Sequence, residues 1–415
     1  MTRLLAPEAF GLMAIAVAVN MWISMLTDFG VKASIIRSNN ANDPAFLATA
    51  WMTQVVRGAV IALGIVAIAG VLWLFQKDGA LPPDKIYSDP RLIVFLLGIA
   101  FSVFLTGLRS IKATLAERDI KLQRVVALEI SGQLVAIFVS IAFAARGAGA
   151  YSLIYGIVAA APFIAIGSFV AFSGPKSRLG FHKTYFLEIF NYGKWLLLAS
   201  LFGFVINRGN QVIFGALMTK LAFSFLAIAT IWINAAEAVV TTVMQRIAYP
   251  AFSEIHRTRP ANIEKAYRSF RLLADIACVA IFVSIVLFAD AALAILYTED
   301  YATNIAPFMK LLSVTILFLP YNLLNTVMLA AGDSKRFTTV VFAPAIALIA
   351  LTPPVFGQFG ETAAILFAAG IRALSLPLMW RYANRVMRVD YRRELIPLII
   401  AFGFIFAALA TDTIV

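Results

Sequence analysis

Charged side chains inside long apolar runs are the residues of this chain best suited to do chemistry. Four are basic and three are acidic. In chain order they are Arg57, Glu129, Lys194, Arg208, Glu237, Asp275 and Arg372. Placing one charged side chain in a membrane costs roughly 2.5–3.5 kcal/mol, so such residues normally face a protein interior or a water-filled cavity.

The four basic residues suit a phosphate-bearing substrate. A guanidinium is a planar fork that holds phosphate oxygens in paired hydrogen bonds. We therefore predict that Arg57, Arg208, Arg372 and Lys194 line a cationic, substrate-binding cavity. Two other interpretations stay open: pairing with a nearby acid, and extension of the side chain to the membrane surface, which applies most to Arg208 and Lys194.

The three acids have two interpretations. A carboxylate inside a membrane can bind a coupling proton or sodium ion. It can also serve as the counter-ion of a buried arginine. Glu129, Glu237 and Asp275 are therefore candidates for ion coupling or for charge neutralisation.

Two common motifs of enzymes are missing from the sequence. It contains no G-x-x-x-x-G-K-[ST] phosphate loop and no H-E-x-x-H pair. The single cysteine, Cys278, has no neighbouring base, and the two histidines, His182 and His256, fall in basic loops. We predict no metal site, no cofactor and no enzymatic activity.

The elements that position these residues follow from the composition. Of 415 residues, 61% are hydrophobic and 13% are charged, and the mean hydropathy is +0.88. The apolar runs are about 20 residues long, enough for a helix to cross roughly 30 Å of hydrocarbon, and they lack the alternation of barrel strands. The sequence predicts an all-α integral membrane fold with about 12 transmembrane helices. The predicted spans are 10–36, 47–75, 92–113, 123–145, 150–172, 186–207, 221–249, 270–297, 306–331, 337–357, 360–380 and 394–411.

The net charge of +12 does not indicate nucleic acid, because the basic residues lie between the spans. Most of them occupy alternate loops, at 32–37, 109–124, 176–183, 246–271, 335–336 and 381–393. The opposite loops carry mainly acids. The positive-inside rule predicts that the basic loops are cytoplasmic.

A weak internal repeat indicates two pseudo-symmetric lobes. FGLMAIA at 10–16 matches FSFLAIA at 223–229, and LAERDIK at 115–121 matches LAAGDSK at 329–335. Transporters are often built from such paired halves. We predict an N-lobe at 1–173, a cytoplasmic linker at 174–185, a C-lobe at 186–387 and an extra helix at 388–415. Because span 186–207 has no counterpart in the N-lobe, we expect the chain to lack its first helix.

Four short segments carry a family resemblance. They are RLLAPEAFG at 3–11, DFG at 28–30, NRGN at 207–210 before IFG at 213–215, and LAAGD at 329–333. Their order and spacing resemble polysaccharide-biosynthesis flippases of the Wzx type, in the multidrug/oligosaccharidyl-lipid/polysaccharide exporter superfamily. At Asn210 the chain departs from the family, whose members frequently carry an acid there, so the resemblance implies no ion-coupling role for that position.

The resemblance implies a multi-pass protein of the bacterial cytoplasmic membrane. Its expected partners are membrane lipids, an undecaprenyl-pyrophosphate-linked oligosaccharide and other polysaccharide-assembly proteins, and we expect no nucleic acid. The predicted function is flipping of this substrate by alternating access, for cell-surface polysaccharide synthesis. Two alternatives stay open: an ion-coupled multidrug antiporter, which would need an acid-dominated site, and a polysaccharide polymerase or ligase, which usually needs larger outer loops.

Overall fold

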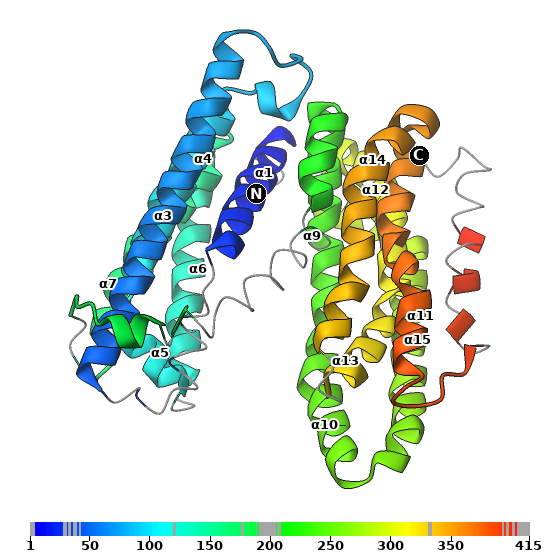
Figure 1. Ribbon diagram of the computed structural model, residues 1–415. Coiled ribbons are helices and arrows are strands. Elements are labelled where there is room, and N and C mark those ends of the chain that lie inside the picture. Colours follow the sequence, from blue (N-terminus) through cyan, green and yellow to red (C-terminus); the bar gives the residue numbers. More distant parts are fainter. Residues whose placement is uncertain are drawn as a thin grey trace. The chain divides into compact units, whose positions relative to one another are not determined.

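The computed structural model divides into two compact helical units (Figure 1). One unit comprises Met1–Phe204 with Thr219–Leu221, and the other comprises Val205–Met218 with Ala222–Val415. The residues described are 5–27, 31, 35, 40, 43–118, 122–175, 178–187, 189–190, 205, 209–330, 334–391, 394–395, 398–400 and 403–404. Over these residues the regular structure is helical throughout, with no strand. The predicted all-α fold is confirmed.

The first unit contains six α-helices among the described residues. They are α1 (Glu8–Leu26), α3 (Pro44–Lys77), α4 (Arg91–Gly107), α5 (Ile111–Arg118), α6 (Leu122–Ala145) and α7 (Tyr151–Val170), with a short 3₁₀ turn, η1 (Ile86–Ser88). Within the unit α3 packs along α4, α4 packs on α7, and α6 pairs with α7. The longest described helix of this unit, α3, has 34 residues. At 1.5 Å per residue it is about 51 Å long, more than the hydrocarbon thickness.

Local sequence explains how α3 starts and why it lies so close to α4. The Asp43 side chain caps the helix by accepting a hydrogen bond from the Ala45 N–H at 2.8 Å, and Pro44 occupies the first turn, where its missing N–H costs nothing. Farther along, Gly58 of α3 meets Gly107 of α4, and a Cβ added to Gly58 would lie 2.9 Å from the Gly107 Cα. The two backbones can touch only because neither residue has a side chain.

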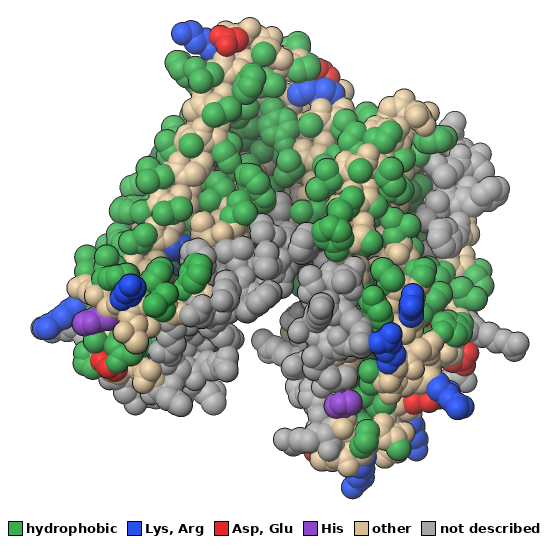
Figure 2. Space-filling model, viewed as in Figure 1, with side chains coloured by type: hydrophobic (Ala, Val, Ile, Leu, Met, Phe, Trp, Pro, Cys, Tyr) green, Lys and Arg blue, Asp and Glu red, His purple; other side chains and the backbone are tan. Residues whose placement is uncertain are grey.

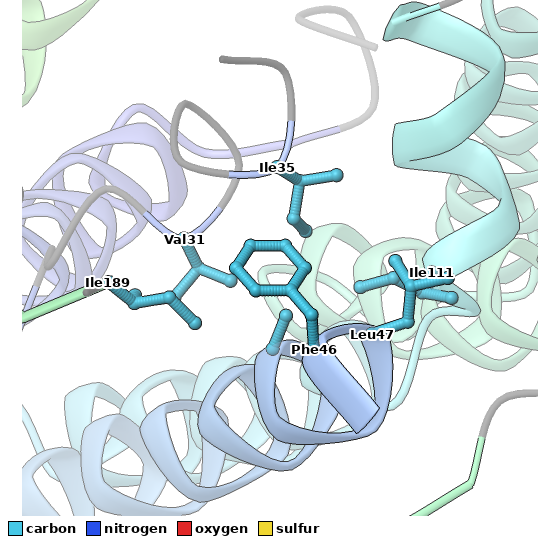
Figure 3. Packing of buried hydrophobic residues seen from close by; sticks show 7 residues of the cluster. Val31, Ile35, Phe46, Leu47, Ile111 and Ile189 are labelled. Atoms are coloured by element: carbon cyan, nitrogen blue, oxygen red, sulfur yellow. The ribbon is translucent and has the colours of Figure 1, made fainter. Parts of the chain in front are cut away.

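A hydrophobic cluster holds the start of α3 in place (Figure 3). Its buried members are Val31, Ile35, Phe46, Leu47, Ala50, Ile111 and Ile189. The Phe46 ring also packs edge-on against Tyr185, with 5.5 Å between ring centroids. Tyr185 and Ile189 therefore pack with the helices of the first unit.

A buried carboxylate orders the loop between α3 and α4. The Asp89 side chain is 2% exposed and forms a forked ion pair with the Arg91 guanidinium, the shorter contact being 2.7 Å. Lys220, which is grouped with this unit, pairs with the same carboxylate. Burial by itself would raise the pKa of Asp89, but the hydrogen bonds from Arg91 and Lys220 lower it to about 2.

The second unit is built around a central helix. Its α-helices are α9 (Lys220–Val243), α10 (Tyr249–Thr258), α11 (Ile263–Leu296), α12 (Glu299–Leu317), α13 (Asn322–Ala330), α14 (Ser334–Gly370) and α15 (Leu376–Ala383). A π-helical segment, η2 (Met244–Ala248), joins α9 to α10, and the 3₁₀ segments are η3 (Pro260–Asn262), η4 (Leu319–Tyr321) and η5 (Ile371–Ser375). Eleven of the 19 residues of α12 are buried, because α11 and α14 both pack on it.

Most of the predicted spans coincide with helices. Eight helices among the described residues are long and apolar enough to cross a membrane, and the shorter Arg91–Gly107 is a further apolar helix. Predicted spans 337–357 and 360–380 form one helical stretch that Gly360 interrupts with a φ of 82°. Most of 186–207 and of 394–411 lies outside the described residues.

Apolar side chains cover the flanks of both units (Figure 2). Leu63 is 67% exposed and Ile295 is 76% exposed, and many other Val, Phe, Leu and Ile side chains are exposed as well. Figure 2 shows charged side chains toward both ends of the first unit and in the lower half of the second, and much of the remaining described surface is hydrophobic. Such a surface suits lipid, so the chain is a multi-pass membrane protein.

Candidate functional site

A polar cavity of about 360 Å³ lies inside the first unit. Helices α1, α3, α4, α5 and α6 and the turn between α4 and α5 supply its walls. The polar lining residues are Asn20, Ser24, Gln54, Arg57, Thr106, Arg109, Ser110, Thr114 and Glu129. The cavity therefore combines two guanidiniums and one carboxylate with several hydroxyl and amide groups, and this set can bind an anion together with a polyol.

Arg57 extends from α3 toward α1. Its Nη2 donates a hydrogen bond to the Ser24 backbone carbonyl at 3.0 Å, and the Ser24 hydroxyl donates to the Asn20 side chain at 3.3 Å. The Ser24 carbonyl also accepts a hydrogen bond from the Thr27 hydroxyl at 3.2 Å. Arg57 thus lines the polar cavity of the first unit.

Arg109 is a second cation of this cavity, although its position in the sequence indicated only a loop residue. It follows the last turn of α4, where backbone carbonyls have no partner inside the helix. Side chains of α3 satisfy them: Gln54 Nε2 donates to the carbonyls of Gly107 and Arg109, both at 2.9 Å, and Trp51 Nε1 donates to that of Arg109 at 3.0 Å. Nothing in the sequence distinguishes Arg109 from the other loop cations, since these contacts span more than 50 residues.

Glu129 of α6 faces Arg109 across the same cavity. Arg109 Nη2 lies 3.7 Å from Glu129 Oε1, and the two side chains are 26% and 48% exposed. The structure therefore places Arg57 and Glu129, two of the residues singled out from the sequence, in the lining of one cavity together with Arg109. The Arg109–Glu129 pair favours the counter-ion interpretation of Glu129.

In the second unit, Arg372 and Glu237 form a pair. Arg372 lies in η5 and Glu237 in α9, with 3.7 Å between Arg372 Nη1 and Glu237 Oε1. Both side chains are about four-fifths buried, at 20% and 18% exposure. Each of these residues is thus a counter-ion of the other, which was one of the two interpretations left open for them.

Asp275 belongs to a buried network that the sequence did not indicate. Arg271 of α11 contacts the Asp275 carboxylate at 2.9 Å and the Glu394 carboxylate at 2.9 Å. The Tyr267 hydroxyl donates to Glu394 at 2.6 Å from a position 127 residues away, and the Arg271 guanidinium stacks 4.0 Å from the centre of the Tyr321 ring. Arg271 is 6% exposed, so it is a core residue, whereas the sequence grouped it with the cytoplasmic basic run.

Two predicted cations, Lys194 and Arg208, lie outside the described residues. Across the part of the chain that the structure describes, no cluster of three or more His, Cys, Asp or Glu side chains is arranged to hold a metal ion.

Comparisons with known proteins agree with this architecture. A family model described as "Polysaccharide biosynthesis protein" matches residues 1–306. Among solved structures, the lipid II flippase MurJ in an inward closed conformation is similar with a TM-score of 0.66 and 11% identity, over 98% of this chain and 90% of that one. An inward-facing multidrug resistance MATE family transporter of the MOP superfamily gives 0.63 and 15%, over 98% and 93%.

A eukaryotic MATE transporter, AtDTX14, gives a TM-score of 0.55 and 13% identity, over 91% of this chain and 88% of that one. No curated protein sequence matches the chain. At these identities the structural likeness establishes the fold and leaves the substrate to be argued from the residues.

Proposed function

The chain belongs to the polysaccharide biosynthesis protein family, and on that premise we propose that it flips an undecaprenyl-pyrophosphate-linked oligosaccharide across the bacterial cytoplasmic membrane. Its transporter-type fold and its apolar flanks place it in a membrane. The proposal concerns the cargo, the compartment and the residues that hold the cargo.

The polar cavity of the first unit is the observation that carries the proposal. Arg57 and Arg109 provide positive charge for a pyrophosphate, which accepts paired hydrogen bonds from guanidinium groups. Asn20, Gln54 and Thr106 provide the amide and hydroxyl groups that a sugar needs. The volume of about 360 Å³ is at the lower end of the range of small-molecule sites, so it accommodates part of the head group only.

The mechanism that we propose is alternating access. The basic loops face the cytoplasm by the positive-inside rule, and the turn that carries Arg109 is one of them. The head group enters from that side while its lipid tail stays in the bilayer, and the protein then opens outward. Lys194, Arg208 and Arg372 are proposed as further cations along the route, and Glu237 and Asp275 as counter-ions or coupling sites. We expect the genes of the glycosyltransferases that assemble the oligosaccharide to lie next to the gene of this protein.

Ion-coupled multidrug export is the second candidate, favoured by the likeness to MATE transporters. Such an exporter would need an acid-dominated site for cationic drugs. In the cavity of the first unit, the two guanidiniums outnumber the single carboxylate among the described lining residues. This charge balance favours an anionic cargo.

Complementation of a flippase-deficient strain tests the proposal. We expect Arg57→Ala combined with Arg109→Ala to abolish surface polysaccharide, because the variant loses both guanidiniums that line the cavity. The exposed Arg388→Ala is the matched control and should complement fully. Membrane levels of each variant are measured in parallel. Full complementation by the double variant at normal membrane level would refute a cationic cavity.

A further inference from the structure

The contact between Arg109 and Glu129 is longer than a hydrogen-bonded ion pair, and one of its side chains is about half exposed. The nitrogen and oxygen lie 3.7 Å apart, beyond hydrogen-bonding distance, and the Glu129 carboxylate is about half exposed. Exposed ion pairs of this kind contribute little stability, because water screens the attraction and both long side chains must be held in place. Glu129 can therefore leave Arg109 at small cost.

The backbone of Arg109, by contrast, is firmly held. Its carbonyl accepts hydrogen bonds from Trp51 Nε1 at 3.0 Å and from Gln54 Nε2 at 2.9 Å, both on α3. Gln54 also holds the preceding Gly107 carbonyl at 2.9 Å. The Arg109 side chain can therefore change rotamer while its backbone stays in place, and its guanidinium can reach the cavity that it lines together with Arg57.

We propose that Glu129 occupies the place of the substrate's phosphate on Arg109, and that a lipid pyrophosphate displaces it on binding. The inference rests on the proposed function, because it assumes a pyrophosphate cargo. A pyrophosphate is a better partner for Arg109 than Glu129 is. It accepts two parallel charge-assisted hydrogen bonds from a guanidinium, whereas the Glu129 carboxylate lies 3.7 Å from Arg109. Arg109 is thus a specificity-determining residue, and Glu129 limits affinity by competing for it.

Competition of this kind has a purpose in a transporter. A cargo held by two guanidiniums in a partly enclosed cavity dissociates slowly unless something replaces it. The Glu129 carboxylate is tethered on α6 beside the site, so its effective concentration near Arg109 is high. It therefore neutralises Arg109 as the pyrophosphate departs and returns the cavity to its starting state.

Binding of two short lipids to the purified full-length protein tests the proposal. Geranylgeranyl pyrophosphate carries the head group, and geranylgeraniol lacks it. We expect Glu129→Gln to bind the pyrophosphate about threefold to fivefold more tightly than the unsubstituted protein, as expected for removal of one partly exposed competing charge. Geranylgeraniol binding should not change. Arg109→Ala should weaken pyrophosphate binding, and adding Glu129→Gln to it should restore no affinity.

Two controls show whether a loss of binding is caused by misfolding. They are the variant Arg109→Lys and a measurement of the Tm of each variant. Lysine keeps the charge but lacks the fork, so this variant should fold normally and bind the pyrophosphate with intermediate affinity. Unchanged or weaker binding by Glu129→Gln would overturn the inference, as would a gain that persists without Arg109. If the unsubstituted protein bound both lipids equally, the pyrophosphate cargo of the proposed function would itself be wrong. Loss of binding on Arg57→Ala, without any gain in Glu129→Gln, would refute only the displacement.

Discussion

Replacing Arg271 by Ala should destabilise the second unit more than any other charge substitution in α11. The side chain is 6% exposed and contacts two carboxylates, Asp275 and Glu394, each at 2.9 Å. Its removal leaves Glu394, which is 3% exposed, without its cationic partner. Breaking a buried pair by removing one partner typically costs about 3–5 kcal/mol. For a unit of this size, that loss corresponds to a fall in Tm of roughly 10 °C.

The matched control is Arg268→Ala, one turn earlier on the same helix. Arg268 also pairs with an acid, Glu264, but its side chain is 47% exposed, so its loss should cost under about 1 kcal/mol. Apparent Tm is measured on both purified variants in the same detergent. A third variant, in which Arg271→Met accompanies Glu394→Gln and Asp275→Asn, leaves no buried charge and should recover part of the lost stability. If Arg271→Ala had the same apparent Tm as Arg268→Ala, the buried network would contribute nothing to stability and the reasoning would be wrong.

Two further substitutions test the first unit. Gly58→Val should lower the free energy of unfolding by about 1–3 kcal/mol, because the valine side chain would collide with the Gly107 backbone. Gly70→Ala is the control and should be tolerated, because nothing lies within 4 Å of the added Cβ. Equal Tm values for the two variants would contradict the close approach of α3 and α4. Asp89 has a pKa lowered to about 2, below its ordinary value of 3.8. The stability it contributes is present above about pH 4 and is lost as the pH falls toward 2. Tm of the unsubstituted protein should therefore fall over that interval more steeply than Tm of Asp89→Asn, and parallel pH profiles would exclude the ion pair as a source of stability.

The structure also changes which residues represent the candidate site. Arg57 and Glu129 were chosen because each interrupts an apolar run, and both line the cavity of the first unit. Arg109, which the sequence indicated as a loop residue, lines the same cavity and contacts Glu129. Arg271, which the sequence grouped with a basic loop, is buried in the core of the second unit. Charge in an apolar run is therefore a useful indicator of a polar interior, but it overlooks cations at helix ends that neighbouring helices enclose.

The sequence by itself determined the fold class and the positions of most helices. Whether a segment can span a membrane depends on its own length and polarity, so helices such as α3 and α7 can be recognised one at a time. The family could also be recognised from short segments in order along the chain. The boundary predicted between spans 337–357 and 360–380 also lies close to the non-helical residue Gly360.

Only the tertiary structure decided which charges meet. The Arg109–Glu129 contact needs α6 to return beside the end of α4, and the Tyr267–Glu394 contact joins residues 127 apart. An ion pair depends on a distance of a few ångströms, which helix packing sets. Hydropathy records only the polarity of each residue and carries no information about distances between helices. A charge in an apolar run thus shows that a partner or a cavity is needed, and the packing of the helices determines which partner it finds.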